Sequence, residues 1–541
     1  MTLRLTSSAL ALAAMTLPAM ADVTPAQVWQ SWIDYYQSVG YTVTEGGRDQ
    51  AGSTLTVKDV TIAGGPETGR ISMTVPQAVL TDQGDGKVKT VFADKLTLDL
   101  AGTEPEGATY EVPITVEMPG NSMISSGAPE DMTHELNYPK LDLIFDKMTS
   151  DGTERAIPAR IGLSDTTGKL HVATGTPTKY DYNLSTTKVA FQGDITDENA
   201  EKVSFAGSLD GMQTQGSMTL PGKIADLETQ MAAALKDGLV MNGVINAGPM
   251  AATFDFAGKD ENDQPTSGAG KYDGKGFDAS FRLSRDGLGY QIGSDAVNFE
   301  MTSAQMPMPI RYGIQNASFD LQLPVVEDAA PQPFKLAYSL AGLTFGDEIW
   351  AMFDKDAKLP RDPASLDLDL TGTMKVIRDV FAPPPAPTED VTPPAEDTDE
   401  ATAGNMDADT PADTDEAQAD NQAAEDAAAV EPSPFEPVEL AINSFALKAL
   451  GASVTASGHL KTPEGGDMAA PLGQIHAEYQ GLNALLDKLG EIGLVPQDQM
   501  MGTRMMLAMF AKPVDGQPDK LTTDVEFKDG GQIFANGQQI K

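Results

Sequence analysis

The chain has 541 residues, of which 37 are Lys or Arg and 79 are Asp or Glu, so its formal net charge is −42, and it contains no cysteine. A protein this acidic repels phosphates, which excludes nucleic acid as an expected partner. The lack of thiols excludes disulfides and cysteine-based chemistry, and the length is typical of roughly two to four domains.

The first 21 residues have the pattern of a secretory signal peptide. Arg4 supplies a positive charge, an apolar run extends from Ala9 to Leu17, and small residues precede a cleavage point after Ala21. The apolar run is shorter than the roughly 20 residues that a membrane-spanning helix needs. We therefore expect secretion through a cleavable signal peptide and a mature chain without a stable membrane span.

Residues 25–39 are predicted to form a helix. Thr24 is a suitable N-cap, Pro25 suits the first turn, and Gly40 ends the pattern. The apolar side chains at helical spacing are Val28, Trp29, Trp32, Ile33 and Tyr36. One interpretation is a helix that docks on a sheet and closes one end of it; the other is a helix that contacts a partner or a membrane. The polar side of this helix lacks Lys and Arg, which favours docking.

From Thr54 onward, apolar residues recur at every second position. Examples are Leu55-x-Val57, Ile71-x-Met73-x-Val75, Leu96-x-Leu98-x-Leu100, Phe254-x-Phe256 and Leu366-x-Leu368-x-Leu370, and Gly- or Asp-rich turns separate such runs. This alternation indicates strands with one buried apolar face and one solvent-exposed polar face. It predicts a β-dominated α+β fold, in which serial short strands form one long antiparallel meander sheet with a few short packing helices.

Four further helices are predicted by apolar spacing. They are centred on Ile224, Leu227, Met231 and Leu235, on residues 348–353, on Leu482, Leu485, Leu486 and Leu489, and on residues 500–510. A strand, a glycine and a helix follow one another in residues 336–353 and again in residues 476–489, which resembles a weak internal repeat.

Residues 382–434 form the clearest boundary in the sequence. This segment has 15 Asp and Glu, no Lys or Arg, and otherwise mostly Ala, Pro and Thr. Such a composition does not bury enough apolar surface to offset the entropy of ordering, so we expect a disordered linker. It separates an N-terminal β-rich region, residues 22–381, from a C-terminal strand–helix–strand region, residues 435–541. The latter continues the first body or packs on it. We favour a solvated insertion between two structured regions over a segment that binds cations with low affinity or acts as an extended tether. Only diffuse screening of its charges by divalent ions is expected.

The sequence offers little catalytic chemistry. His134, His171, His459 and His476 lack metal-ligand spacing, so we interpret them as strand or loop residues. The run Ser185-Thr186-Thr187-Lys188 matches Ser-x-x-Lys but lacks the companion motifs of penicillin-binding enzymes, and it falls in a strand-like run. No catalytic residue, metal or cofactor is expected, and a non-enzymatic role is favoured over catalysis.

A methionine-rich helix is the most suggestive local feature. Its candidate ligand-binding residues are Met500, Met501, Met505, Met506, Met509 and Phe510. Methionines give an adaptable apolar surface, which suits a groove for a lipid, a peptide or another hydrophobic ligand. Thioethers holding Cu(I) are a further alternative. Packing on the last strands of the sheet is the interpretation that we favour.

Three stretches carry a family resemblance: residues 24–32 (Thr-Pro-Ala-Gln-Val-Trp-Gln-Ser-Trp), Gly64-Gly65-Pro66, and residues 366–372 (Leu-Asp-Leu-Asp-Leu-Thr-Gly). With them, most of the chain outside the acidic linker resembles the uncharacterised secreted bacterial proteins of domain-of-unknown-function family 2125. The tail of residues 529–537 is similar to the closing hairpin of other envelope proteins. The resemblance implies a periplasmic location and a β-rich body, and it implies no catalytic residues.

Three hypotheses for the function follow. The first is a periplasmic, non-enzymatic protein that binds lipid or another hydrophobic envelope ligand on an apolar sheet face. The second is a hydrolase of envelope polysaccharide that acts through paired carboxylates. The third is a structural interaction protein of the envelope, with an envelope protein as its partner.

Overall fold

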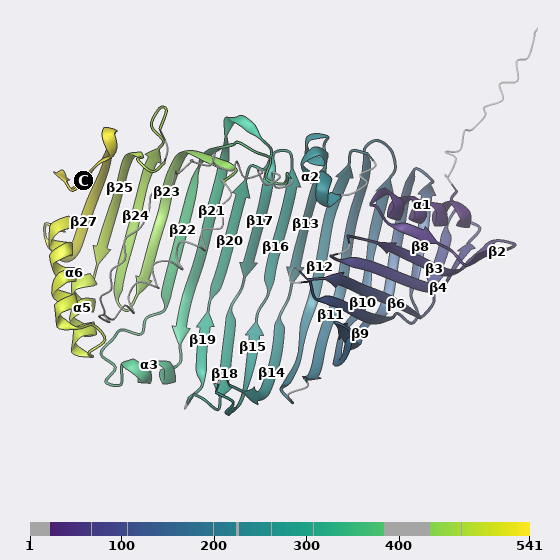
Figure 1. Ribbon diagram of the computed structural model, residues 1–541, viewed down its shortest axis with the longest axis horizontal. Helices are drawn as coiled ribbons and strands as arrows, with labels where there is room; N and C mark the ends of the chain where they lie inside the picture. Colours follow the sequence, from purple (N-terminus) through teal and green to yellow (C-terminus); the bar gives the residue numbers. More distant parts are fainter. Residues whose placement is uncertain are drawn as a thin grey trace, which may run out of the picture.

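The computed structural model describes residues 22–66, 68–104, 107–197, 200–222, 227–260, 262–306, 308–382, 433–466 and 468–541. Within these residues, 29 strands form one antiparallel sheet that is accompanied by five α-helices (Figure 1). The predicted β-dominated fold with a long antiparallel sheet and a few short helices is confirmed. The predicted signal peptide and nearly all of the predicted acidic linker lie outside the described residues.

The bounds of the elements are as follows. The helices are α1 (Pro25–Ser38), α2 (Leu227–Lys236), α3 (Asp347–Phe353), α5 (Leu482–Glu491) and α6 (Gln497–Phe510), with a 3₁₀ turn η1 (Asp529–Gly531). The strands are β1 (Thr42–Thr44), β2 (Gly47–Ala51), β3 (Thr54–Gly64), β4 (Arg70–Asp82), β5 (Val88–Phe92), β6 (Lys95–Thr103), β7 (Thr109–Glu117), β8 (Ser122–Ala128), β9 (Asp131–Ser150), β10 (Thr153–Ala173), β11 (Thr178–Thr196), β12 (Lys202–Leu220), β13 (Val240–Ala247), β14 (Met250–Lys259), β15 (Pro265–Gly274), β16 (Phe277–Ser284), β17 (Gly287–Ser294), β18 (Val297–Ser303), β19 (Ile310–Ile314), β20 (Asn316–Leu323), β21 (Asp328–Phe345), β22 (Ala364–Val376), β23 (Phe435–Ala449), β24 (Ala452–Lys461), β25 (Leu472–Gln480), β26 (Lys512–Val514), β27 (Gln517–Lys528), β28 (Gln532–Ala535) and β29 (Gln538–Gln539).

The sheet alternates between full-length strands and two tracks of half-length strands. β12 pairs with β13 through one half of its length and with β14 through the other half. From there, β13–β16–β17–β20 form one track and β14–β15–β18–β19 form the other, until both tracks pair with β21 (Figure 1). A shorter two-track region, β5–β8 beside β6–β7, lies between β4 and β9.

The full-length strands are longer than the sequence indicates. β10 has 21 residues although it contains Pro158, Gly162 and Gly168, which punctuate the alternating pattern. Its ladders to β9 and β11 run past these residues, with an irregularity between Ala156 and Ala159 on the β9 side and a positive φ at Asp165. A neighbour on each side keeps the strand extended where its own sequence favours a break.

Helix α1 begins and ends where its sequence predicts. The backbone N–H of Gln27 donates to the Thr24 hydroxyl, and the Gln27 side chain accepts from the Thr24 N–H, which completes a capping box. Gly40 takes a positive φ of 89° directly after the helix. The predicted docking helix is therefore present, and its apolar side contacts the sheet.

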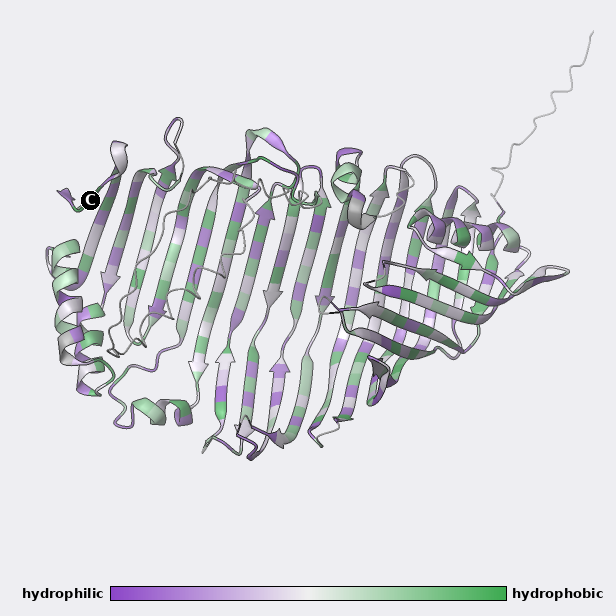
Figure 2. Ribbon diagram, viewed as in Figure 1, coloured by the Kyte–Doolittle hydropathy of each residue, from purple (hydrophilic) through white to green (hydrophobic). Residues whose placement is uncertain are grey.

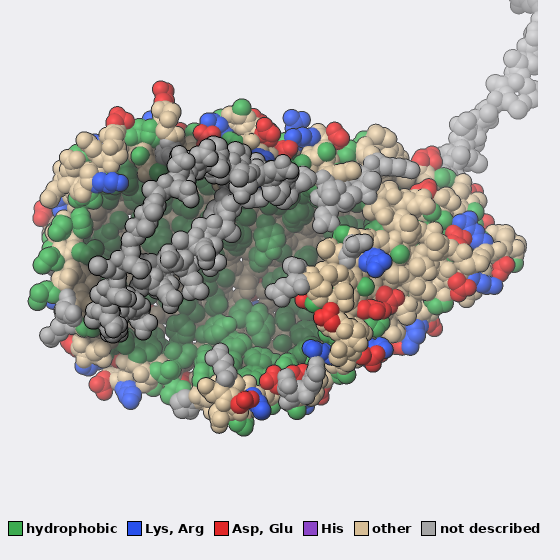
Figure 3. Space-filling model, in the orientation of Figure 1, with side chains coloured by type: hydrophobic (Ala, Val, Ile, Leu, Met, Phe, Trp, Pro, Cys, Tyr) green, Lys and Arg blue, Asp and Glu red, His purple; other side chains and the backbone are tan. Residues whose placement is uncertain are grey.

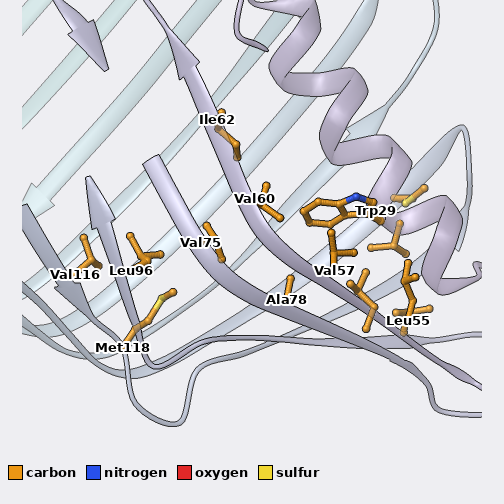
Figure 4. Packing of buried hydrophobic residues seen from close by; sticks show 14 of the residues in the cluster. Trp29, Leu55, Val57, Val60, Ile62, Val75, Ala78, Leu96, Val116 and Met118 are labelled. Atoms are coloured by element: carbon orange, nitrogen blue, oxygen red, sulfur yellow. The ribbon is translucent and has the colours of Figure 1, made fainter. Parts of the chain in front are cut away.

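The N-terminal strands curl over the strands that follow them and enclose the first hydrophobic core (Figure 1). Val28 and Trp29 of α1 pack there with residues of β3, β4, β6, β7 and β9, as Figure 4 shows for part of the cluster. Val57 and Val60 have no exposed surface, and Trp29 is 5% exposed. A second core lies around α2, where Leu235 joins Leu220, Leu283 and other side chains from β11–β13, β16 and β17.

The two sides of the acidic segment belong to the same sheet. β22 and β23 are antiparallel neighbours from Ser365–Lys448 to Val376–Phe435. The N–H of Ile377 also donates to the carbonyl of Pro434, 2.9 Å away. The C-terminal region therefore continues the N-terminal sheet. Helix α5 contacts β24 and β27, and α6 contacts α5, at the far end of the sheet from α1 (Figure 1).

Candidate functional site

One face of the sheet is uncharged and mostly apolar across fifteen strands. Directly opposed residues of antiparallel strands point to the same side, so the register identifies each row of neighbours. One such row runs through His134, Leu170, Tyr182, Gly216, Gly243, Phe281, Tyr290, Leu321, Leu336, Leu370, Ile442, Gly458, Ile475, Val525 and Ala535. We call the side of the sheet that carries this row the apolar face.

The track of β14, β15, β18 and β19 contributes a second row to the apolar face. It runs through Leu143, Ile161, Phe191, Gly207, Ala252, Tyr272, Phe299, Tyr312 and Phe345. Neighbouring rings contact one another: the centroids of Phe299 and Tyr312 are 5.0 Å apart. Both tracks therefore present the same kind of surface.

The opposite face is charged, because the intervening residues point there. It carries cross-strand ion pairs such as Lys188–Asp210 at 3.6 Å and Lys202–Asp194 at 3.3 Å. Hydrogen bonds from Arg311 and Lys271 hold the pKa of Glu300 at about 2 on this face. The alternation is visible as bands of opposite hydropathy along the strands in Figure 2. We call this side the polar face.

The apolar face is hollowed and open. Figure 3 shows hydrophobic side chains gathered in the hollow in front of the central strands. Seven large apolar side chains on this face are 37–47% exposed: Tyr182, Val203, Ile245, Phe277, Tyr290, Phe345 and Leu447. Contiguous apolar surface of this extent is uncommon on monomeric soluble proteins and marks a site of interaction.

Glycines make room for aromatic rings on the apolar face. Gly193 lies opposite Phe205, and Gly268 lies opposite Phe256. A Cβ atom added to either glycine would lie 2.5 Å from the ring of the opposed phenylalanine. The rings therefore lie across the neighbouring strand instead of standing away from the sheet. The similar fragments Phe205-Ala206-Gly207 and Phe256-Ala257-Gly258 occur in β12 and β14, which are paired neighbours.

We expect Gly268→Ala to destabilise the protein by about 1–3 kcal/mol, because its methyl group would overlap the Phe256 ring and would lie 2.6 Å from the carbonyl of Thr302. Gly289→Ala is the matched control, since the nearest atoms to its added Cβ are 3.8 Å away. Urea unfolding of both variants measures the difference. Equal stability of the two variants would show that the rings do not need this space.

A cavity of about 650 Å³ lies between α1 and the apolar face of β9–β13, β16 and β17. Its aromatic lining comprises Trp32, Tyr35, Tyr36, Tyr180, Tyr182, Tyr290 and Phe281. Ring contacts connect the helix to the strands. The ring centroids of Tyr35 and Tyr180 are 5.4 Å apart, and those of Trp32 and His134 are 5.7 Å apart. We call this cavity the α1 chamber.

The histidine of the α1 chamber is buried and is hydrogen-bonded to a buried serine. His134 is 3% exposed, and its Nδ1 is 2.8 Å from the hydroxyl of Ser125, which has no exposed surface. Burial lowers the pKa of His134 to about 4, so the imidazole is neutral at pH 7. A fully buried serine does not reach a substrate, and no Asp or Glu is among the described residues that line the chamber. A hydrolase with paired carboxylates therefore gains no support here.

The methionine residues that the sequence singled out lie elsewhere. Met501, Met505, Met506 and Met509 are 56–69% exposed on α6, and Met500 is half-buried near Gly490 of α5. The carbonyl of Phe510 accepts hydrogen bonds from Thr523 of β27 and from Asn536. None of the six lines the α1 chamber. Met501, Met505, Met506 and Met509 form an exposed surface at the opposite end of the sheet, and the role of the six residues in binding stays a prediction.

The other sequence candidates lie in strands. His134 is in β9, His171 in β10, His459 in β24 and His476 in β25, and residues 185–188 lie in β11. In the described part of the chain, no three His, Asp or Glu side chains are grouped as ligands of a metal ion. No helix there has both the length and the hydropathy to cross a bilayer.

The tyrosines of the α1 chamber are functional candidates that the sequence did not identify. Tyr180, Tyr182 and Tyr290 stand in alternating runs that look like those of any half-buried strand. Their shared position follows from the successive pairings β11–β12–β13–β16–β17, which bring together segments more than 100 residues apart. On the side of the chamber formed by α1, the helical spacing of Trp32 and Tyr36 was the sequence signal that indicated an aromatic surface.

Comparisons with known proteins give a family and little more. No curated protein sequence matches the chain significantly. A crystal structure of the ferric citrate transporter FecA in its unliganded form covers 92% of this chain and 76% of its own, with 8% identity and a TM-score of 0.16, which is too low to support any argument. The model of the family described as "Uncharacterized protein conserved in bacteria (DUF2125)" matches residues 247–534. This range contains the motif at residues 366–372, whereas the motifs at residues 24–32 and 64–66 lie before it. Because the match spans more than half of its length, the chain belongs to this family of conserved bacterial proteins.

Proposed function

We propose that the protein is exported to the periplasm and there binds the hydrocarbon chains of lipids along its apolar face, without catalysing a reaction. The observation that carries this proposal is the row of uncharged residues that continues across fifteen strands. A soluble protein that exposes such a surface needs an apolar partner to cover it.

The dimensions of the apolar face favour hydrocarbon chains. Strands lie about 4.8 Å apart, so fifteen strands extend roughly 65 Å along the sheet. One leaflet of a bilayer core is only about 15 Å thick. The apolar face is therefore several times longer than a lipid tail, and it suits several chains at once or one chain in successive positions. Its hollow shape covers a chain from more than one side.

The proposed location follows from the sequence. The N-terminal 21 residues read as an export signal, and the chain has no cysteine that an oxidising compartment would affect. The lipids of the cell envelope are then the available apolar ligands. An interaction with an envelope protein through the same face is the competing outcome of the experiment below.

We expect the processed protein, purified from a Gram-negative host without detergent, to carry lipids that organic extraction and mass spectrometry detect. It should also bind the fluorescent fatty acid cis-parinaric acid. The double variant Val203→Lys/Leu447→Lys should bind this probe about tenfold more weakly, equal to about 1.4 kcal/mol. Both side chains are more than 40% exposed, so the lysines reach water in the empty protein. A hydrocarbon covering them would dehydrate two ammonium groups.

The matched control is Ser204→Lys/Ala446→Lys, which places the same charges one residue away on the polar face. Ser204 lies opposite Asp194 and Asp255, and Ala446 lies opposite Asp367, so each lysine has a carboxylate beside it. We expect this control to bind like the wild type. Absence of lipid from the purified protein together with no binding of the probe, or equal loss in both double variants, would contradict the proposal.

A further inference from the structure

We propose that the α1 chamber binds the methyl end of a lipid hydrocarbon chain, so that a chain on the apolar face lies with its polar end directed away from α1. This inference rests on the proposed function and adds to it a defined end site and an orientation.

The α1 chamber is closed on its helix side. Val28 and Trp29 fix α1 in the first hydrophobic core, because both are buried there. This placement directs Trp32, Tyr35 and Tyr36 toward the chamber, where Tyr35 contacts Tyr180. A chain that enters along the sheet therefore ends against the aromatic rings of the helix.

The α1 chamber continues into the rest of the apolar face. Tyr290 and Ile245 line it and are 37% and 39% exposed. Tyr290 also belongs to the row that goes on through Leu321 of β20 and Leu336 of β21. A hydrocarbon held in the chamber thus has an uninterrupted apolar path toward the C-terminal strands.

The chemistry of the lining selects an uncharged group. The lining residues that the structure describes include no Lys, Arg, Asp or Glu. The hydroxyl of Ser31 donates to the carbonyl of Val28, the hydroxyl of Thr174 donates to the carbonyl of Glu130, and His134 is bonded to Ser125. A carboxylate or phosphate inside the chamber would lose its hydration without gaining a cationic partner. The methyl end of a chain has no such cost.

The size and polarity of the chamber agree with this assignment. Its volume of about 650 Å³ is typical of sites that enclose a small ligand. Burial raises the pKa of Tyr36 to about 12, with smaller contributions from Tyr35, Tyr138 and Tyr41, and burial also raises the pKa of Tyr35 and Tyr180. The direction at Tyr36 indicates that little water surrounds its phenol group, whereas the neighbouring Tyr35 is 38% exposed.

The test uses two photoreactive palmitic acids with the full processed chain. One carries a diazirine at its methyl end and the other carries it next to the carboxyl group. After irradiation, peptide mass spectrometry locates the labelled residues. We expect the methyl-end probe to label α1, β11, β13 and β17, and the carboxyl-end probe to label strands farther along the sheet.

Two tryptophan variants provide the control. Ala279→Trp fills part of the chamber, whereas Ala446→Trp adds the same bulk at a half-buried alanine of β23 on the polar face. Ala446 lies opposite Asp367 and Thr455. We expect Ala279→Trp to reduce chamber labelling at least fivefold and Ala446→Trp to leave it unchanged, with circular dichroism as the check on folding.

The outcomes separate the two proposals. Methyl-end labels spread evenly over the apolar face, or carboxyl-end labels in the chamber, would overturn the end site while leaving lipid binding intact. Labels confined to the polar face, or none at all, would overturn both. The wild-type labelling pattern alone decides this, even if a tryptophan variant does not fold.

Discussion

Replacing Trp29 by alanine is expected to destabilise the N-terminal end of the sheet by about 3–5 kcal/mol. Trp29 is 5% exposed in the first hydrophobic core, and its indole N–H donates to the Glu45 carboxylate 2.8 Å away. Alanine would leave a cavity and remove this hydrogen bond. The loss should be local, because the second core around α2 does not include this residue.

Hydrogen exchange measures this locality. We expect amides of β3 and β4 to lose protection in Trp29→Ala while those of β22–β24 keep theirs. Trp350→Ala is the matched control, since Trp350 is 7% exposed beside Phe345 and Phe353 at α3. It should affect α3 and spare β3 and β4. Equal loss of protection at both ends would show that the sheet unfolds as one unit and would contradict two separate cores.

The stability of the protein is expected to fall by about 3 kcal/mol between pH 6.5 and pH 4 through His134 alone. Burial lowers the pKa of His134 from 6.5 to about 4 in the folded protein. Between these values the unfolded chain takes up a proton at this position and the folded chain does not. The contribution of neutral His134 to the free energy of unfolding is therefore complete above pH 6.5 and is lost as the pH falls toward 4.

The variant His134→Asn isolates this contribution, because asparagine is not titratable and keeps a polar atom for Ser125. Urea unfolding at pH 7 and at pH 4.5 gives the difference for each protein. His171 and His476 act in the opposite direction, since hydrogen bonds to Asp131 and Asp524 raise their pKa values, and both occur in either protein. An unchanged pH dependence in His134→Asn would show that His134 is not buried as described.

The sequence was sufficient for the class of fold and for its first helix. The Thr24–Gln27 capping pair and the aromatic spacing of α1 are local signals, and the structure reproduces both. The alternation of residues such as Leu366, Leu368 and Leu370 correctly gave strands with two unlike faces, because side-chain direction in a strand follows from position alone.

The two-track arrangement was not predictable in this way. Whether β12 pairs with one long strand or with two short ones depends on contacts between residues far apart in the sequence. Within β10, Gly162 and Gly168 look like breaks, yet the ladders to β9 and β11 continue past them. The local preference of a glycine is outweighed where both neighbouring strands are in place.

The candidate site was only partly predictable, for a related reason. An apolar sheet face was expected, whereas the specific residues proposed were the methionines of α6. Composition makes a cluster such as Met505 and Met506 conspicuous. Tyr180 and Tyr290 are ordinary strand residues until the register brings them beneath α1.

The two-track arrangement also makes the sheet extensible. β12 and β21 are full-length strands that bound the long two-track region, and only half-length hairpins lie between them. Inserting one further hairpin into each track would lengthen the surface by roughly 10 Å while both boundary strands keep their partners on the outer side. The number of half-length strands thus sets the length of the apolar face, and duplication of residues 240–284, which hold β13 to β16, would add two strands to each track.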